Sequence, residues 1–306
     1  MADRRGLAFA AMARIGLLWQ GAKPFGQPTI TILGYHDVVD GSQFRRHLEF
    51  LSEHYTVLSQ AEVLNLVKGE LSVPHPAWIT FDDGYPSTFE TGLRVLSEVG
   101  LPATAFICPG VMLEGASHWW EVVSAAAALG LSIEGIAVDG EEVAHLKHAD
   151  DTTRRRRVCE IRTYLERSGW KDGAGSLTEE HIAQWVSAGN SIGNHTWDHP
   201  LLDKSSKAEQ TRQITLAHEW IQDTVRPSTL AFSYPNGYVT EHAEEVITAL
   251  GYTLAVLFDH RRSHTTHPLR LSRLRVNSTD TDDEFVAKVS GVHPFIHHRL
   301  HRERRD

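Results

Sequence analysis

The sequence predicts an α/β protein in which parallel strands alternate with helices. Short apolar runs rich in β-branched residues recur along the chain, and segments with helical periodicity separate them. Six or more such strands suit either a (β/α) barrel or an open, doubly wound sheet. With 306 residues, the chain is long enough to bury a large core without disulfide bonds.

Six apolar runs are expected to form strands, at residues 29–34, 77–81, 103–107, 191–193, 229–233 and 254–258. Four helices are expected between them, at residues 44–54, 87–99, 207–222 and 240–250. Gly100 and Gly251 each follow a helical pattern and precede a strand, and glycine commonly ends a helix at that place.

The regular alternation stops between about residues 117 and 176, which are expected to form a helical insertion. The stretch holds a tryptophan pair, an alanine-rich helix and a charged helix over 154–167. Trp119 and Trp120 either line a groove or anchor the insertion to the barrel, and we favour the anchor. The four arginines at 154–157 are interpreted as a solvated helix face.

The two ends of the chain are expected to lie outside the regular fold. Residues 1–28 are interpreted as an amphipathic helix with a lead-in segment, because Arg14 interrupts the apolar run at 7–19. That run is too short to span a membrane, which favours a cytoplasmic location and leaves peripheral membrane contact open. Residues 291–306 form a tail rich in histidine and arginine, interpreted as a frayed terminus.

Charge and cysteine content narrow the classes of function. The chain has 30 Lys and Arg residues against 39 Asp and Glu, a formal net charge of −9, which argues against a nucleic-acid binder. Its two cysteines, Cys108 and Cys159, cannot form a disulfide framework, and Cys108 is expected to be a buried thiol. Glycine-rich phosphate-binding motifs are absent from the sequence, so nucleotide binding by motif is unsupported.

Two adjacent carboxylates, Asp82 and Asp83, follow the strand at 77–81 and precede Gly84. In an α/β barrel, residues just beyond the carboxyl end of a strand lie on the face where active sites are built. Neighbouring carboxylates repel one another, so the fold must supply a cation or a shared proton. Alone, the pattern is more typical of an ordinary turn.

Two histidines, His195 and His199, follow the strand at 191–193. On one helical turn, residues four apart point the same way and can share an ion. A lone pair of this kind is often fortuitous in a chain with 19 histidines. With the aspartates, however, the pair supplies two imidazoles and a carboxylate with open positions, which indicates a catalytic metal site. Zinc is the default ion, and other first-row ions remain open.

These motifs resemble those of the polysaccharide deacetylases, carbohydrate esterase family 4. TFDDGY at 80–85 and HTWDHP at 195–200 are similar to the first two family motifs, and AFSYPNG at 231–237 is similar to the third. GYHDV at 34–38 resembles the opening of one branch that acts on bacterial surface glycans and their precursors. The resemblance extends from about residue 29 to residue 290.

The resemblance implies a distorted (β/α)7 barrel, a single domain, that removes N-acetyl or less often O-acetyl groups with a metal-activated water. It implies that Asp83, His195 and His199 are metal ligands and that Asp82 is the general base. The expected partner is an acetylated carbohydrate, in a glycan or a glycan precursor. Two alternatives remain, an amidohydrolase acting on a non-sugar C–N bond and a catalytically silent carbohydrate-binding barrel.

The general acid that protonates the leaving amine is ambiguous. His36 lies at the end of the first expected strand, and His260 ends the sequence LFDH, which matches a short late motif of many family members. We favour His36, because the branch with the YHxV/I opening often lacks the late histidine.

The third motif departs from the family pattern R-x-P-Y. Ser233 and Asn236 stand where that pattern has arginine and tyrosine. Tyr234 and Asn236 are expected near the substrate, with the backbone N–H of Asn236 as an oxyanion donor. Arg273 is the candidate for the missing arginine, and a surface arginine is the alternative.

Two aromatic residues flank the expected metal ligands. Tyr85 follows the aspartates and Trp197 lies between the histidines. Each either stacks on a sugar ring or packs around the mouth of the barrel.

Overall fold

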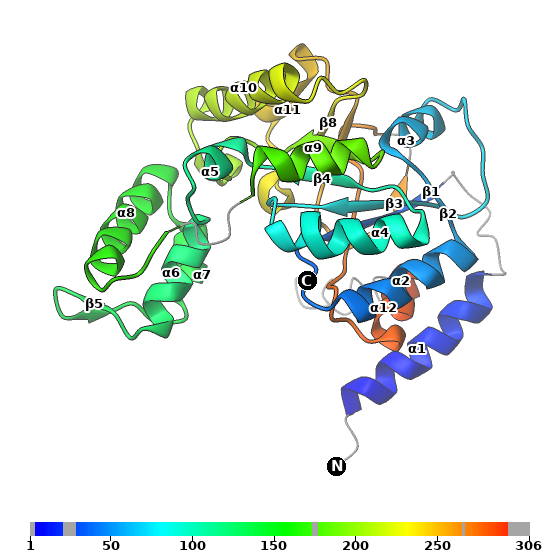
Figure 1. Ribbon diagram of the computed structural model, residues 1–306, viewed down its shortest axis with the longest axis horizontal. Coiled ribbons are helices and arrows are strands. Elements are labelled where there is room, and N and C mark those ends of the chain that lie inside the picture. The colour runs from blue at the N-terminus through cyan, green and yellow to red at the C-terminus, as the bar shows by residue number, and fades with distance from the viewer. Residues whose placement is uncertain (1–3, 21–28, 173–176, 265–266, 293–306) are drawn as a thin grey trace, which may run out of the picture.

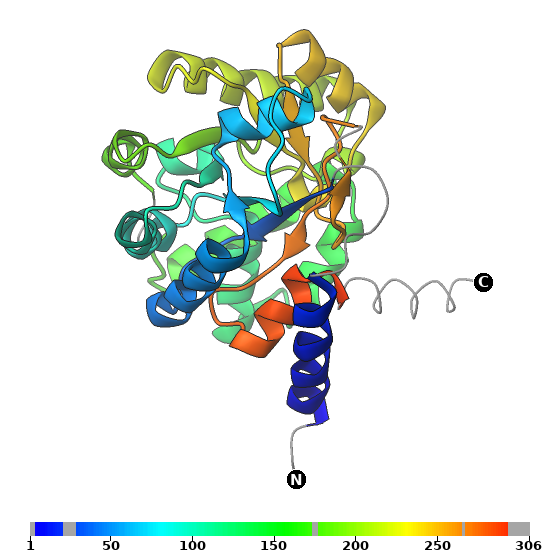
Figure 2. The same cartoon turned by 90° about the vertical axis from the view of Figure 1, so that its right-hand side faces the viewer.

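The computed structural model of the chain describes residues 4–20, 29–172, 177–264 and 267–292. A curled sheet occupies its centre, and helices pack around that sheet (Figures 1 and 2). The strands of this sheet are β1 (Thr29–Tyr35), β2 (Thr56–Val57), β3 (Pro76–Phe81), β4 (Thr104–Ile107), β7 (Ser191–Asn194), β8 (Ala231–Ser233), β9 (Leu254–Val256), β10 (Ser263–His264) and β11 (Leu274–Arg275).

Neighbouring strands pair in the order β10, β1, β3, β4, β7, β8, β9. The pairings from β1 to β9 are parallel, β10 runs antiparallel to β1, and β2 pairs with β3. The segment 271–275 pairs with β9 through a parallel bridge between Val256 and Leu271, and with β1 through β11. These pairings confirm the expected distorted (β/α)7 barrel.

The helices around the barrel are α2 (Gly41–His54), α3 (Gln60–Val67), α4 (Leu93–Val99), α5 (Pro109–Leu113), α9 (Glu179–Ser187), α10 (Lys207–Thr224), α11 (Glu241–Ala249) and α12 (Asp282–Val289). Several begin at a Ser, Thr or Asp side chain that accepts a backbone N–H of the first turn, as Ser59 and Thr281 do. All six predicted strands and all four predicted helices are present.

Side chains alternate across each strand, so every second side chain points into the barrel. In β1, Ile30 and Ile32 pack with Trp78 in one buried cluster, whereas Leu33 and Tyr35 pack in another with residues of α2 and α4. Residue 36 continues the row of Ile30 and Ile32 beyond the strand. Residue 82 continues the row of Trp78 in the same way, so both positions fall at the mouth of the barrel.

The insertion between β4 and β7 forms a unit beside the barrel (Figure 1). It consists of α6 (Trp119–Ala128), the hairpin of β5 (Ser132–Ile133) and β6 (Ile136–Ala137), α7 (Glu142–His148) and α8 (Asp151–Arg167). It has a hydrophobic core of its own, which includes Trp119. His118 and Trp120 of the insertion contact the loops that carry Asp83 and His199.

The expectation of a solvated arginine face on α8 is wrong for two of the four arginines. Arg154 is 2% exposed, because its guanidinium pairs with Asp151 and lies 5.4 Å from the centre of the Trp119 ring. Arg155 forms a half-buried ion pair with Asp198 of the barrel. Helix α8 therefore turns charged side chains toward the barrel as well as toward solvent.

The N-terminal helix α1 (Arg4–Gln20) packs against α12. It buries Phe9 and Ala13 and leaves Leu7 and Ile15 exposed. Among the described residues, no helix is both long and apolar enough to cross a bilayer. Most of the His- and Arg-rich tail at 291–306, and the lead-in segment at 21–28, lie outside the described residues.

Any side chain at position 237 is expected to destabilise the fold. Its φ is +76°, and an added Cβ would lie 2.7 Å from Cβ of Phe258 and 2.8 Å from its Cα. Gly251 has a similar φ of +82° but no heavy atom within 4 Å of the added Cβ. Gly251→Ala is therefore expected to cost about 1 kcal/mol for the left-handed backbone alone. Gly237→Ala should cost about 3 kcal/mol, because overpacking adds to that strain.

Urea unfolding of the two variants measures this difference. Equal losses of stability would contradict the close approach of residue 237 to Phe258.

Candidate active site

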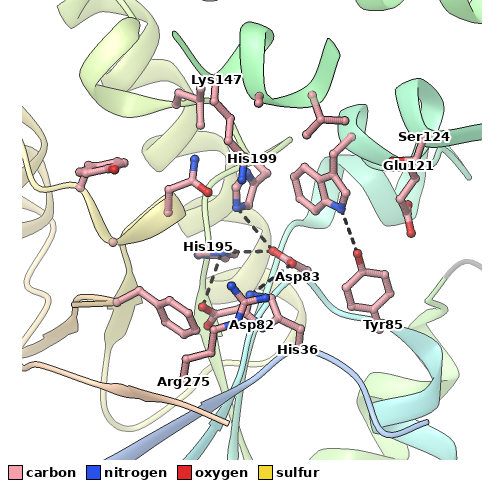
Figure 3. A pocket seen from close by; sticks show the side chains of 18 of the residues that line it. His36, Asp82, Asp83, Tyr85, Glu121, Ser124, Lys147, His195, His199 and Arg275 are labelled. Atoms are coloured by element: carbon pink, nitrogen blue, oxygen red, sulfur yellow. Dashed lines mark hydrogen bonds and ion pairs between the residues drawn. The ribbon is translucent and has the colours of Figure 1, made fainter. Parts of the chain in front are cut away.

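A cavity of about 1090 Å³ opens at the carboxyl ends of the barrel strands. The barrel contributes side chains that follow four of its strands: His36, Asp82, Asp83, His195, His199 and Asn236. The insertion forms a facing wall with Trp120, Glu121 and Ser124 of α6 and with Lys147 of α7 (Figure 3). The cavity therefore lies between the barrel and the insertion.

Three buried side chains converge at the floor of this cavity. The candidate ligand atoms of Asp83, His195 and His199 all lie within 4.8 Å of one another. Nε2 of His195 is 3.3 Å from Oδ1 of Asp83, and Nε2 of His199 is 3.5 Å from the same oxygen (Figure 3). That oxygen is buried and accepts no hydrogen bond from the described residues. A buried carboxylate oxygen that faces two imidazoles suits a divalent cation, so these residues fit a metal.

The backbone places these ligands in a way that the sequence did not predict. Residues 195–200 form a loop and not a helical turn, so helical spacing does not bring the histidines together. Thr196 and His199 adopt left-handed conformations, with φ of 71° and 59°, and Asp83 has φ of 71°. Such conformations cost energy in residues other than glycine and cluster at functional sites. The turns of two loops thus aim the three ligands at one point.

A backbone carbonyl fixes the ring of His195. Nδ1 of His195 donates to the carbonyl oxygen of Ser233 at 2.7 Å, which leaves Nε2 facing Asp83. Metal-binding histidines commonly orient the ring by such a bond from the second nitrogen.

Arg273 neutralises Asp82 through a two-point ion pair. Its Nη1 donates to Oδ1 at 2.8 Å and its Nη2 donates to Oδ2 at 2.6 Å. The remaining guanidinium donors reach the carbonyl oxygen of Leu257 at 2.8 Å, Oγ1 of Thr80 at 3.0 Å and Oγ of Ser233 at 2.8 Å. All five N–H groups of Arg273 thus have acceptors.

The surface-arginine alternative for Arg273 is wrong, because its exposed fraction is 0%. Ser233, which stands in the arginine place of the third motif, accepts a hydrogen bond from Arg273. A distant segment of the chain therefore supplies the guanidinium beside Asp82.

The charges of the site hold its groups in definite protonation states. Burial raises the pKa of Asp82, but the charge and hydrogen bonds of Arg273, together with the imidazoles of His195 and His36, outweigh burial and hold the pKa below its usual value. Burial also raises the pKa of Asp83, yet the neighbouring imidazoles hold it well below the usual range. Burial lowers the pKa of His199 to about 3. Near neutral pH, both carboxylates are therefore ionised and His199 is neutral, the forms that bind a cation. Burial lowers the pKa of His195, but the charges of Asp82 and Asp83 raise it above its usual value, so this imidazole gives up a proton when a cation binds.

Of the two candidate general acids, the structure brings His36 to the cavity. Nε2 of His36 lies 4.0 Å from Oδ2 of Asp83, and its side chain is 31% exposed. The His36 ring meets Phe258 edge to face, with ring centres 5.3 Å apart. His260 is not among the residues that line the cavity. Its ring meets that of Phe258 edge to face, with ring centres 5.8 Å apart.

Of the four residues within or beside the motifs that were expected to contact the substrate, two line the cavity and two do not. Tyr85 and Asn236 line the cavity, and Asn236 has a left-handed φ of 54°. Trp197 does not line it, because its indole lies on Gly110, where any Cβ would clash. Tyr234 does not line it either, because its side chain is buried with Phe232.

The sequence did not indicate His118 as part of the site, and it indicated Trp120 only as the less favoured of two alternatives. Nε2 of His118 donates to the backbone carbonyl of Asp83 at 3.0 Å, and its ring stacks on Trp120 at 4.4 Å. The Trp120 ring lies 4.6 Å from that of His199, and its Nε1 donates to the hydroxyl of Tyr85 at 3.1 Å. Trp119 packs in the core of the insertion and does not anchor it to the barrel, so the favoured role is wrong for this residue. Trp120 lines the cavity, which is the alternative role.

Comparison with known proteins points to one family. Residues 72–255 match the family model described as Polysaccharide deacetylase. A protein of Bacillus subtilis (strain 168) named "Putative polysaccharide deacetylase YxkH" is 22% identical over 273 residues, which cover 86% of this chain and 77% of that protein.

The fold is similar to several solved structures. For the Streptococcus pyogenes deacetylase PplD in complex with acetate, the TM-score is 0.63 at 18% identity, covering 86% of this chain and 99% of that one. For IcaB from Ammonifex degensii, the TM-score is 0.58 at 17% identity, covering 87% and 98%. For the de-N-acetylase from Aggregatibacter actinomycetemcomitans, it is 0.58 at 12% identity, covering 85% and 100%. At these identities the likeness is one of fold.

Removal of any one candidate ligand is expected to weaken cation binding. Asp83→Ala or His195→Ala should lower the Zn²⁺ affinity of the metal-free chain by about 100-fold or more, because three protein ligands become two. His148→Ala is the matched control, since His148 lines the same cavity on the insertion side. Competition with a chromophoric chelator measures the affinities. Unchanged affinity in both ligand variants would contradict the site.

Proposed function

The chain belongs to the polysaccharide deacetylase family, and on that premise we propose that it removes an acetyl group from an N-acetylated sugar of a glycan or glycan precursor. The observation that carries this proposal is the buried cluster of Asp83, His195 and His199 beside the ionised Asp82. The names of two structural relatives, a deacetylase with bound acetate and a de-N-acetylase, support the choice of reaction.

Asp83, His195 and His199 would hold the divalent cation, for which we propose Zn²⁺. A cation bound there would acidify a water molecule and polarise the acetyl carbonyl. Two imidazoles and one carboxylate also suit other first-row ions, so the metal content of the purified chain decides among them.

Asp82 is the general base of the proposed reaction. It is adjacent to the cluster, with Oδ2 4.0 Å from Nε2 of His195, yet Arg273 holds both of its oxygens. Each carboxylate oxygen can accept two hydrogen bonds, so the bonds from Arg273 leave capacity for a water proton. Asp82 takes the proton of the attacking water, and Arg273 keeps its carboxylate in one orientation.

His36 is the proposed general acid, because an amine departs poorly as an anion. It lies beside Asp83 at the cavity wall and is partly exposed, so it can recover a proton from solvent after each turnover. The backbone N–H of Asn236 is the proposed oxyanion donor, and Tyr85 offers an aromatic face to the sugar. The cytoplasmic location stays a prediction from the sequence.

Acetate release tests the reaction directly. The purified chain, loaded with Zn²⁺, is expected to release acetate from at least one class among lipid-linked, nucleotide-linked and polymeric acetamido sugars. A chelator should abolish the release, and added Zn²⁺ should restore it. Hydrolysis of small non-sugar amides alone would point to an amidohydrolase. Sugar binding without any release would point to a silent barrel, and either result would overturn the proposal.

The role of His36 is tested by comparing substrates whose leaving groups do and do not need a proton. His36→Ala is expected to lower kcat for an acetamido sugar by about 100-fold. Hydrolysis of 4-nitrophenyl acetate should change by less than about threefold, because nitrophenolate departs without a proton. His260→Ala is the matched control and should leave both rates near wild type. Near wild-type amide turnover in His36→Ala would refute the assignment.

A further inference from the structure

We propose that Arg155, on helix α8 of the insertion, is a positioning residue for the metal centre. Its ion pair with Asp198 holds the loop that carries His195 and His199. The inference rests on the proposed function only in taking these histidines as ligands of a cation. It assigns the insertion a part in building the centre, beyond its place as one wall of the cavity.

The contact between the insertion and this loop is specific. Nη1 of Arg155 donates to Oδ2 of Asp198 at 2.9 Å, and Nη2 donates to Oδ1 at 2.8 Å. Asp198 lies between the two histidine ligands and directly precedes His199. Nε of Arg155 also donates to Asp151 of the same helix at 2.7 Å, which fixes the guanidinium. A two-point pair of this kind sets orientation as well as distance.

A second set of contacts connects Arg155 to the same loop. Its Nη2 reaches Oε1 of Glu209 at 3.3 Å, and Nε2 of Gln213 donates to that oxygen at 3.0 Å. Oε1 of Gln213 in turn accepts the backbone N–H groups of Trp197 and Asp198, at 3.1 and 3.0 Å. The loop is therefore held between α10 of the barrel and α8 of the insertion, and Arg155 contacts both acidic groups.

His199 needs such support because its own ring lacks an orienting bond. Nδ1 of His195 is fixed by the carbonyl of Ser233, whereas Nδ1 of His199 is buried without a hydrogen-bond partner among the described residues. The left-handed backbone of His199 is also strained. The direction of this imidazole thus depends on the loop backbone, which Asp198 and Gln213 hold in place.

Cation affinity tests this role without any use of turnover. Arg155→Met is expected to weaken Zn²⁺ binding by the metal-free full chain by about 10- to 100-fold, the range typical of groups that orient a ligand. Arg155→Lys keeps the positive charge but loses the two-point contact with the carboxylate. Its Zn²⁺ affinity should therefore lie between those of Arg155→Met and the wild type. Competition with a chromophoric chelator gives the values.

Arg157→Met is the matched control. Arg157 lies on the same helix and is also paired with two carboxylates, those of Glu142 and Glu160, both within the insertion. The Zn²⁺ affinity of Arg157→Met should stay within about twofold of wild type, because those ion pairs do not reach the loop that carries His195 and His199. An equal loss in Arg157→Met would mean that any disturbance of α8 weakens the site, and it would overturn the proposal.

A double-mutant cycle covers the case in which Arg155→Met does not fold. Asp198→Asn alone is expected to weaken Zn²⁺ binding by about 10- to 100-fold. Adding Arg155→Lys to Asp198→Asn should cause no further loss, because both substitutions break the same ion pair. Additive losses, or wild-type affinity in these variants, would overturn the proposal. Cation binding without acetate release would defeat the proposed function and leave this inference intact. Absence of cation binding in the wild-type chain would defeat both.

Discussion

The buried ion pair between Asp82 and Arg273 is the interaction on which the site depends. Two carboxylates follow one another at the end of β3, and each has its own compensating partner. Arg273 neutralises Asp82, whereas the imidazoles of His195 and His199 face Asp83. Breaking such a buried pair on one side leaves an uncompensated charge, at a cost of about 3–5 kcal/mol. The pairing thus separates one carboxylate that can bind a cation from one that stays free to accept a proton.

The same stretch of backbone completes the barrel and delivers the guanidinium. Residues 271–275 bridge to β9 at Val256 and pair with β1 through β11, and Arg273 lies in the middle of this segment. Strand alternation turns its side chain inward, where Ser233 leaves room and accepts a hydrogen bond. An arginine at position 233 would place a second guanidinium beside the first. A small residue at position 233 therefore goes together with the arginine at position 273, because only one guanidinium fits beside Asp82.

The sequence predicted the parts whose signals are local. Apolar runs located six strands, and Asp82, Asp83, His195 and His199 stand directly after two of them. Two-residue strands such as β11 have no periodicity to detect, so the place of Arg273 remained ambiguous. The ligands converge through left-handed turns, which residue spacing does not reveal. His118, Trp120 and Arg155 of the insertion reach the site only through tertiary packing. The tryptophan pair was visible in the sequence without its role, and no local pattern marks the other two residues.

In the proposed reaction, Asp82 accepts a proton without holding the cation. Zn²⁺ content and acetate release are measured for Asp82→Asn, which keeps the shape of the side chain and one oxygen for Arg273. Circular dichroism checks that the variant folds, because the amide removes the counter-charge of the buried guanidinium. We expect one bound Zn²⁺ with affinity near wild type, and turnover lower by about 100- to 10,000-fold. Loss of the cation would make Asp82 a ligand, and turnover near wild type would remove it from the chemistry. Either result would contradict the account.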